Sequence, residues 1–316
     1  MSGSVQGLSR KIESAGELEN VVRAMKALAT SSIEQYQQAV RALEEYARTV
    51  ELGLGACLRE SPDSFPRAKR PSRRPFLIAL LIGSDQGLAG RFNEILVDYV
   101  VGELAKIEHE KRQLWVVGGR AASLLADSGL PKTTGFAVPT SVHQITGLVG
   151  EILVDLEHCR ETEGRLEVHV FHNRPGASAS YEPVGRRLLP LDEAWRRKTR
   201  AAPWPTASSP EVIEGPSATL RAFIQGHLFV GLFQAFAESL ASENASCLAS
   251  MQRAEKNIGD MLEDLGRDFR RRRQEGIDEE LFDVISGYEA LAKAPAAAPP
   301  AAAGSLPPSR GGSRSP

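Results

Sequence analysis

The residues best placed for chemistry form the loop GSDQGLAGRFN, residues 83–93. The loop follows a continuous apolar run and precedes an amphipathic segment, which is where phosphate-binding loops lie in α/β proteins. It lacks the GxGxxG spacing of dinucleotide sites and the GK[ST] ending of a P-loop. A nucleotide cradle is therefore one interpretation. The favoured one is a tight strand-to-helix turn in which Asp85 acts as a turn or capping residue.

The other residue types that perform catalysis or bind metals are not spaced for either task. The six histidines include no HxxxH or HExxH pair, and the three cysteines lie far apart, which fits a reducing compartment. His169 and His172 are three residues apart on an expected strand, so they should point to opposite faces. Ser84 and Ser180 lack the context of a nucleophile elbow. We expect no catalytic residue, no cofactor and no metal site.

A run of four arginines, Arg270–Arg273, is the other notable feature. Such a run is often a solvated helix face. It is also suited to an acidic loop on a partner, because guanidinium groups form bidentate pairs with carboxylates. The residues alone leave both interpretations open.

Two long amphipathic segments must position these residues. Within 8–58 the apolar residues recur at steps of three or four, close to the period of a coiled-coil seam. At 1.5 Å per residue this helix would span about 75 Å. A similar pattern covers 211–291. Neither helix could bury its apolar stripe alone, so we expect the two to pack on each other as a shaft.

The second long helix has two characters. Its first part, from Phe223 to Leu240, is apolar nearly all round, which predicts contact with the middle of the chain as well as with the first helix. Its later part has a narrower stripe and contains four glycines, at positions 259, 266, 276 and 287. Glycine is unfavourable in a helix by about 1 kcal/mol. These glycines suggest close approach by neighbours or a need for compliance.

The middle of the chain alternates strands and helices, which predicts a small sheet with helical crossovers. Phe76–Ile82 is apolar throughout, as in a strand buried on both faces. The other expected strands are 113–117, 165–172 and 180–189, and the expected helices are 94–107, 120–128 and 142–158. The fold class is therefore α/β, with a long coiled coil of the terminal helices and an inserted small Rossmann-like domain.

Proline-rich segments separate these predicted elements. They divide the chain into a first shaft helix, a linker, a central α/β domain, a second shaft helix and a tail: 1–60, 61–75, 76–200, 211–291 and 292–316. The tail is rich in Pro, Ala and Gly and has too few large apolar residues for a core, so we expect it to be disordered.

Composition limits the remaining possibilities. The formal charge of the 316 residues is −2, which gives no global attraction to nucleic acid or to an anionic membrane. The N-terminal residues lack the apolar core of a signal peptide. The longest apolar stretch, 228–237, is too short to span a bilayer. We expect a soluble protein that could dock on a membrane-bound partner.

Three further sequence blocks are informative when taken together. The first is VVRAMKALA, residues 21–29, preceded by Arg10-Lys11-Ile12. The second lies in 84–93 and includes Asp85, Gly87, Leu88, Gly90 and Asn93. The third comprises Ser242-Glu243, Ala245, Met251, Ala254 and Asn257, then Arg273-Gln274, Ile277, Glu280 and VISG at 284–287. These blocks are similar to the gamma subunit of F-type ATP synthases, the central stalk of the rotary motor, and the resemblance covers about residues 5–291.

This resemblance implies an antiparallel coiled coil inside a head of alternating alpha and beta subunits, with the middle domain near the epsilon subunit and the ring of c subunits. Catalysis would belong to the neighbouring subunits. It further implies that Met25, Arg273 and Gln274 lie near acidic loops of beta, where Arg270, Arg271 and Arg272 would add charge. The chain would be peripheral to the cytoplasmic face of a bacterial inner membrane, held there only through the c-ring, and would bind no nucleic acid.

The chain departs from the family pattern at several positions. Cys247 stands where the family has Arg, Asp278 where it has Thr, and Gln86 and Ala89 where it has Arg and Cys. These departures suggest an alternate bacterial subclass resembling the N-ATPases. Two other functions stay open on the residues alone: a coiled-coil adaptor with an inserted α/β domain, and a flavodoxin-like enzyme with helical arms. Co-purified subunits would distinguish the three.

Overall fold

The computed structural model describes residues 5–60, 75–109, 111–130, 132–176, 181–208, 210–211 and 216–292. The predicted linker, apart from Pro75, and the predicted tail from residue 293 onward lie outside this described part. The chain divides into two compact units, Ala15–Asp260 and a second unit that combines Met1–Ser14 with Met261–Pro316. Each unit is described by itself.

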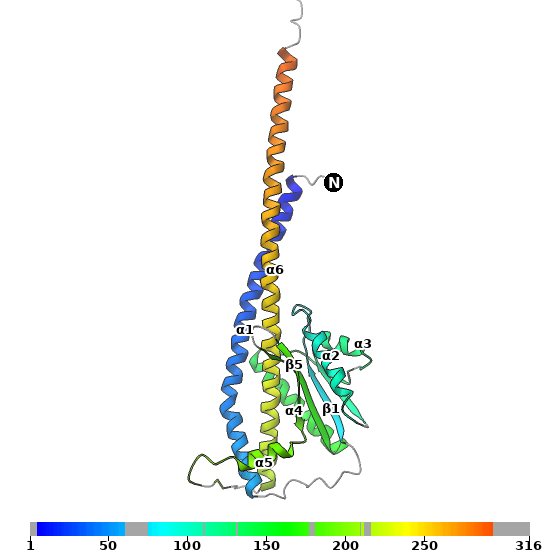
Figure 1. The fold of residues 1–316 in the computed structure, drawn as a ribbon, viewed down its shortest axis with the longest axis vertical. Coiled ribbons are helices and arrows are strands. Elements are labelled where there is room, and N and C mark those ends of the chain that lie inside the picture. The colour runs from blue at the N-terminus through cyan, green and yellow to red at the C-terminus, as the bar shows by residue number, and fades with distance from the viewer. Residues whose placement is uncertain are drawn as a thin grey trace, which may run out of the picture. The chain divides into compact units, whose positions relative to one another are not determined.

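The two long helices are α1, Val5–Glu60, and α6, Pro216–Ala292 (Figure 1). Within Ala15–Asp260 they are antiparallel. Lys26 of α1 forms an ion pair with Glu255 of α6, whereas Gly53 of α1 lies against the ring of Phe223 of α6. The start of α1 in this unit therefore faces the later part of α6, as predicted.

The sheet has five strands in the order β3-β2-β1-β4-β5. Their bounds are β1 Phe76–Ile82, β2 Arg112–Val117, β3 Thr134–Phe136, β4 Leu166–Pro175 and β5 Tyr181–Leu189. The first four strands are parallel, and β5 pairs antiparallel with β4. The connecting helices are α2 Phe92–Leu104, α3 Gly119–Asp127, α4 Val142–Glu163 and α5 Glu193–Ala201. Every residue of β1 is buried, which confirms the prediction from its apolar run.

Helices cover both faces of this sheet (Figure 1). One core joins alternate strand residues to α2 and α3. The other joins the opposite set, including Ile78 and Leu80, to α4, to Tyr36 of α1 and to the first part of α6. The apolar all-round character of that part of α6 follows from this position, because it contacts the sheet as well as α1.

Two elements were not predicted from the sequence. β3 has only three residues, too few to show a pattern. α5 has the sequence EAWRRKTRA and begins where the Asp192 side chain accepts a hydrogen bond from the amide of Ala194. Trp195 of α5 packs on Leu54 of α1 and Leu220 of α6. Its single large apolar residue gave no helical stripe to detect, so tertiary packing decides its place.

Candidate functional site

The first part of α6 is hydrogen-bonded to the edge of the sheet. Three serines donate from their hydroxyl groups to main-chain carbonyl oxygens: Ser239 to Ile82 (3.0 Å), Ser242 to Asn173 (3.1 Å) and Ser246 to Ala89 (2.7 Å). Their spacing of three and four puts them on one helix face. Ile82 ends β1, and Asn173 lies near the end of β4. We call Ser239, Ser242, Glu243 and Ser246 with their partners the polar seam.

The loop after β1 is the other side of the polar seam. The side chain of Asn93 accepts from the amide of Ser84 and donates to the Ser84 hydroxyl, both at 2.9 Å. That hydroxyl donates in turn to the carbonyl of Gln86 at 3.0 Å. Ser84 and Asn93 are buried. These bonds close the start of the loop into a tight turn, in agreement with the favoured interpretation of the sequence.

Asp85 is a capping residue, although it caps a helix other than the one that follows it. Its carboxylate accepts a hydrogen bond of 2.7 Å from the amide of Gly119, the first residue of α3. A carboxylate at this end of a helix is stabilised by the exposed amides and the helix dipole. The preceding residue, Gly118, has φ of 97°, and a Cβ atom there would lie 2.6 Å from the Ser84 carbonyl oxygen. Only glycine fits this close approach.

Of the five middle-block residues that match the family, the structure brings Asp85 and Asn93 into this network. Gly90 adopts a positive φ of 64° in the same loop. Leu88 is exposed at the loop surface, and a Cβ atom on Gly87 would meet nothing within 4 Å in the described chain. The block thus forms the folded connection from β1 to α2, and it contacts α6 through the hydrogen bond from Ser246 to the carbonyl of Ala89.

Glu243 contributes a carboxyl group to the polar seam from α6. Its pKa is raised to about 7, chiefly by burial, while the neighbouring Ser84 side chain acts in the opposite direction and the charge of Asp85 contributes to the rise. Burial and the neighbouring Glu243 also raise the pKa of Tyr36 on α1. Glu243 therefore lies where α1, α6 and the loop after β1 meet.

A second polar contact joins α6 to the end of β4. His172 Nε2 and Glu238 Oε2 are 2.9 Å apart, and the side-chain amide of Gln234 donates to the same carboxylate at 2.7 Å. Burial alone would raise the pKa of Glu238, but the hydrogen bonds from His172 and Gln234 outweigh it and lower the pKa. His172 and His169 do point to opposite faces, since His169 contacts Glu167 instead.

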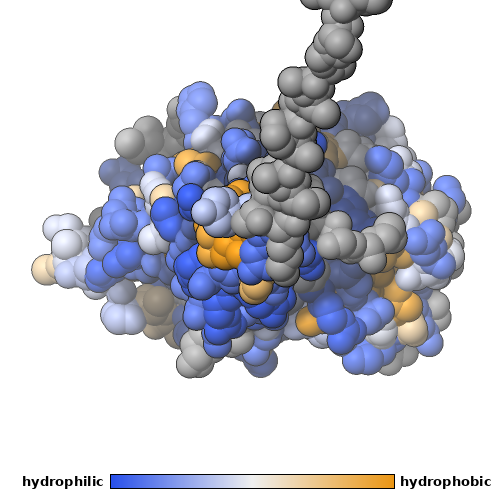
Figure 2. All heavy atoms as spheres, turned by 90° about the horizontal axis from the view of Figure 1, so that it is seen from above, coloured by the Kyte–Doolittle hydropathy of each residue, from blue (hydrophilic) through white to orange (hydrophobic). Residues whose placement is uncertain are grey.

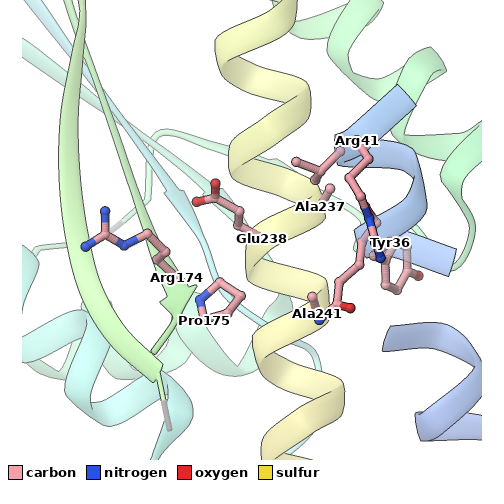
Figure 3. Close-up of a pocket in the computed structure, with 9 residues that line it drawn as sticks. Tyr36, Arg41, Arg174, Pro175, Ala237, Glu238 and Ala241 are labelled. Carbon is pink, nitrogen blue, oxygen red and sulfur yellow. The ribbon is translucent and has the colours of Figure 1, made fainter. Parts of the chain in front are cut away.

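An open groove of about 500 Å³ adjoins this contact (Figure 3). Tyr36 and Arg41 reach it from α1, and Arg174 comes from the end of β4. Glu238 and two alanines of α6 form the middle of its lining. Arg174 also forms an ion pair with Glu182 of β5. The groove marks the line along which the helix pair meets the sheet.

α5 holds the helix pair at the other end of this unit. The rings of Trp195 and His227 are 4.8 Å apart. Arg59 of α1 donates to the carbonyls of Arg200 and Ala202 at 3.2 and 3.0 Å. Burial and the charge of Arg186 lower the pKa of His227 to about 4. This histidine is therefore neutral at physiological pH.

The predicted partner-contact residues fall in both units. Met25 is half-buried on α1, in the unit that contains the sheet. In the other unit Arg270, Arg271, Arg273 and Gln274 are exposed on α6, and Arg272 is half-buried. Arg271 contacts Asp268 at 3.0 Å and Glu275 at 3.9 Å on its own helix. Their contact with another subunit stays a prediction.

Beyond the arginines, α6 carries apolar side chains that are exposed at helical spacing: Ile277, Leu281, Val284, Ile285 and Tyr288. In the space-filling view, hydrophobic residues form small patches within a mostly hydrophilic surface (Figure 2). A row of this kind on one helix face is typical of a protein–protein contact.

The polar seam was missed from the sequence except for Ser242 and Glu243, which were noted only as family matches. A signal was present, because Ser239, Ser242 and Ser246 recur at helical spacing beside an apolar segment. The contact between His172 and Glu238 had no such signal. The two residues are 66 positions apart and meet only through the fold.

Comparison with known proteins identifies the chain's relatives. The family described as ATP synthase matches residues 4–291. The chain belongs to the ATP synthase gamma-chain family. A gamma chain of Frankia casuarinae is 27% identical over 304 residues, covering 92% of this chain and 99% of the relative. A gamma chain of an Arthrobacter species is 27% identical over 303 residues, with the same coverage.

Solved structures agree with this membership at the level of fold. The rotor of the Euglena gracilis mitochondrial ATP synthase matches with a TM-score of 0.55 and 17% identity, over 87% of this chain and 99% of that chain. The central stalk of the Tetrahymena thermophila mitochondrial enzyme matches with a TM-score of 0.52 and 20% identity, over 74% and 99%. As in the sequence, no helix among the residues described for this gamma-family chain is long and apolar enough to cross a membrane.

Proposed function

We propose that the chain is the central rotor shaft of an F-type ATP synthase or ATPase, which couples ion-driven rotation of the c-ring to the nucleotide sites of the alpha/beta head. Membership of the gamma-chain family supports this function. The observation that carries this proposal is the difference between the first and last parts of α6. Its first part is hydrogen-bonded to the sheet through the polar seam, and its last part presents exposed apolar side chains and arginines.

The partners in this proposal are the alpha and beta subunits, the epsilon subunit and the c-ring. The related solved structures are described as a rotor, as a central stalk with c-ring, and as an assembly of OSCP, F1 and c-ring. The chain itself would be non-catalytic, with nucleotide hydrolysis carried by its neighbours. It would lie peripherally at the cytoplasmic face of a bacterial inner membrane and reach the membrane only through the c-ring.

We further propose that Met25, Arg270–Arg273 and Gln274 contact acidic loops of the beta subunits. The exposure of Arg270, Arg273 and Gln274 supports this role. Arg271 is engaged by Asp268 on its own helix, so it would have to exchange that partner for a beta carboxylate. Exposed ion pairs contribute only about 0–1 kcal/mol, so exchange is feasible.

Two finer points accompany the proposal. We propose that the chain consists of five functional segments. They are a first shaft helix, a linker, a central domain, a second shaft helix and a tail, at 1–60, 61–75, 76–200, 211–291 and 292–316. The departures at Cys247 and Asp278 support an alternate, N-ATPase-like subclass. The coupling ion would be set by the membrane subunits.

Co-purification tests the function directly. A tagged full-length chain, isolated from detergent-solubilised membranes of its own organism, should bring alpha, beta, epsilon and c subunits in a complex that hydrolyses ATP. The chain alone should show no turnover. Recovery of unrelated proteins without alpha and beta would support an adaptor instead. Turnover by the pure chain that is lost on changing Asp85 or Gly87 would support an enzyme.

A substitution on the last part of α6 tests whether this part contacts the head subunits. Phe282 is 70% exposed on the last part of α6. Replacing it by Asp should weaken capture of the head subunits while the purified chain keeps its thermal stability. Val154 on α4 is equally exposed at 70% and serves as the matched control. Equal capture by Phe282→Asp and Val154→Asp would contradict a head contact at this face.

A further inference from the structure

The apolar surface of the first part of α6 does not fix the rotation of this helix about its own axis. The segment lies between α1 and the sheet (Figure 1) and contributes residues to the core on several sides. Ala235 and Ala237 are two residues apart, so they point to nearly opposite sides of the helix, and they are 2% and 0% exposed. Burial of apolar surface has no preferred direction. Turning the helix would therefore exchange one apolar face for another.

Two serines of the polar seam make contacts that do have a direction. Ser239 donates to the carbonyl of Ile82 at 3.0 Å, and Ser246 donates to the carbonyl of Ala89 at 2.7 Å. Because seven residues are nearly two turns, both hydroxyl groups leave the same side of α6, about 10 Å apart along its axis. Ser242 lies between them, but its hydroxyl also meets a carbonyl of its own helix at 2.8 Å. Ser239 and Ser246 are therefore the contacts that depend most on how α6 is turned.

A small rotation of α6 would break both hydrogen bonds together. A serine hydroxyl lies farther from the helix axis than the Cα atoms, which are about 2.3 Å from it, so a turn of about 30° moves the hydroxyl by more than about 1 Å. The bonds from Ser239 and Ser246 would then be stretched or bent out of hydrogen-bond geometry. A shift of α6 along its axis by one residue, about 1.5 Å, would have the same effect. The two bonds thus select one rotation and one axial position.

We propose that Ser239 and Ser246 are positioning residues that lock α6 at one rotation and one axial position against the sheet. Buried polar side chains have this role in coiled coils, where a single one can fix the register of otherwise interchangeable apolar faces. The consequence for rotation rests on the proposed function. A locked α6 turns together with the sheet and transmits torque to it, whereas an unlocked α6 can turn without it.

Distance measurements on the full-length free chain test the lock. Spin labels are attached at Lys256 of α6 and Asp127 of α3, which are both exposed, after the three native cysteines are replaced by alanine. Pulsed electron paramagnetic resonance should give one narrow distance distribution for this reference chain. In Ser239→Ala/Ser246→Ala the distribution should broaden or divide into two. Ser246→Thr keeps a hydroxyl group at a half-buried position and should match the reference.

A core variant separates loss of the lock from general loosening. Ile145 on α4 is completely buried, and Ile145→Val removes a methylene group from the core without changing a directional bond. Its distribution should stay narrow. A narrow distribution in the double serine variant, or equal broadening in Ile145→Val, would overturn the lock. If the double variant does not fold, Ser246→Ala alone is compared with Ser246→Thr in the same way.

The assembled complex provides a readout that a merely structural role would not change. In vesicles that contain the complex, ATP hydrolysis is measured together with ion uptake, followed by a pH-sensitive dye and by radioactive sodium. The amount of ion taken up per ATP should fall several-fold in Ser239→Ala/Ser246→Ala and stay unchanged in Ile145→Val. Proportional losses of hydrolysis and uptake would mean that the serines serve stability alone, which would overturn the lock. A complex that lacks this chain would defeat the proposed function and leave the spin-label result standing.

Discussion

The first and last parts of α6 use the same kinds of residue for opposite purposes. Leu232 and Phe236 are completely buried against the sheet and α1. Phe282 and Tyr288 are 70% and 75% exposed, although they lie on the same continuous helix. Apolar residues in the first part form the chain's own core, whereas those in the last part make no comparable core within the described residues. The first part of α6 is therefore packed within the chain, whereas the last part exposes the apolar face on which we propose that a partner subunit packs.

Polar residues follow the same division. In the first part the short side chains of Ser239 and Ser242 are buried and bond to main-chain carbonyls of the sheet. In the last part they are long and charged, as in Arg270 and Arg273, and they are exposed. Short hydroxyls fix one geometry, while long cations can adapt to a partner's carboxylates.

The largest expected effect comes from Phe236. Truncating this buried ring in Phe236→Ala should reduce the free energy of unfolding by about 3–5 kcal/mol, through lost burial and the cavity left behind. Phe282→Ala should change it by no more than about 0.5 kcal/mol, because the side chain is already in water. Urea unfolding of the full-length chain, followed by circular dichroism, measures both. Equal losses in the two variants would abolish the distinction between the two parts of α6.

A pH effect should also belong to the first part of α6. The pKa of His227 is lowered from 6.5 to about 4 in the folded chain, so the unfolded chain binds a proton first as pH falls. Stability contributed by the neutral histidine is fully present above 6.5 and is lost as the pH falls towards 4. The shift sets an upper limit of about 3 kcal/mol on this loss.

His227→Phe removes the titrating group but keeps an aromatic ring against Trp195. Its unfolding free energy should fall less than that of the wild type between about pH 6.5 and about pH 4.5. His143→Phe, at an exposed position on α4, is the control and should follow the wild type. An acid sensitivity that survives unchanged in His227→Phe would mean that His227 is not the responsible group.

The sequence predicted the parts of this fold that depend on local pattern. The apolar run Phe76–Ile82 gave β1, and the stripes gave both long helices. It did not reveal α5, whose position depends on Trp195 fitting beside His227. Packing between elements distant in the chain leaves no local period, so such elements escape pattern analysis.

The same reasoning explains which site residues could be foreseen. Asp85 was expected as a turn or capping residue from its loop, but its partner Gly119 is 34 residues away and could not be named. The polar seam likewise depends on tertiary contact. The arginine run was visible in the sequence at once, whereas its contact with another subunit stays a prediction.

The arginine run provides a functional test of the last part of α6. Replacing Arg270–Arg273 by glutamine should lower the ATPase activity of the assembled complex by about tenfold, equivalent to about 1.4 kcal/mol, if the arginines face beta-subunit carboxylates. Assembly should be retained. Arg267→Gln, whose guanidinium is engaged by Asp264 on its own helix, is the control. Unchanged turnover in the fourfold variant would favour a solvated face.

The smallest expected effect concerns two glycines of α6, and it tests the same division at the level of single atoms. A Cβ atom on Gly226 would lie 3.2 Å from the Tyr46 hydroxyl and 3.2 Å from a methyl group of Val50. On Gly259 it would meet nothing within 4 Å among the described residues. Alanine favours a helix over glycine by about 1 kcal/mol. At Gly226, overpacking of about 1–3 kcal/mol opposes that gain.

Gly259→Ala should therefore raise the free energy of unfolding by about 0.5–1 kcal/mol, whereas Gly226→Ala should leave it unchanged or lower it. The sequence alone offered close approach or compliance as reasons for the late glycines, and the open space at Gly259 removes close approach by any residue that the structure describes. If Gly259→Ala stabilises the free chain yet slows the assembled complex, the glycine serves a partner or a bending motion. A loss of stability in the free chain would instead mean that α6 is not a regular helix at this position.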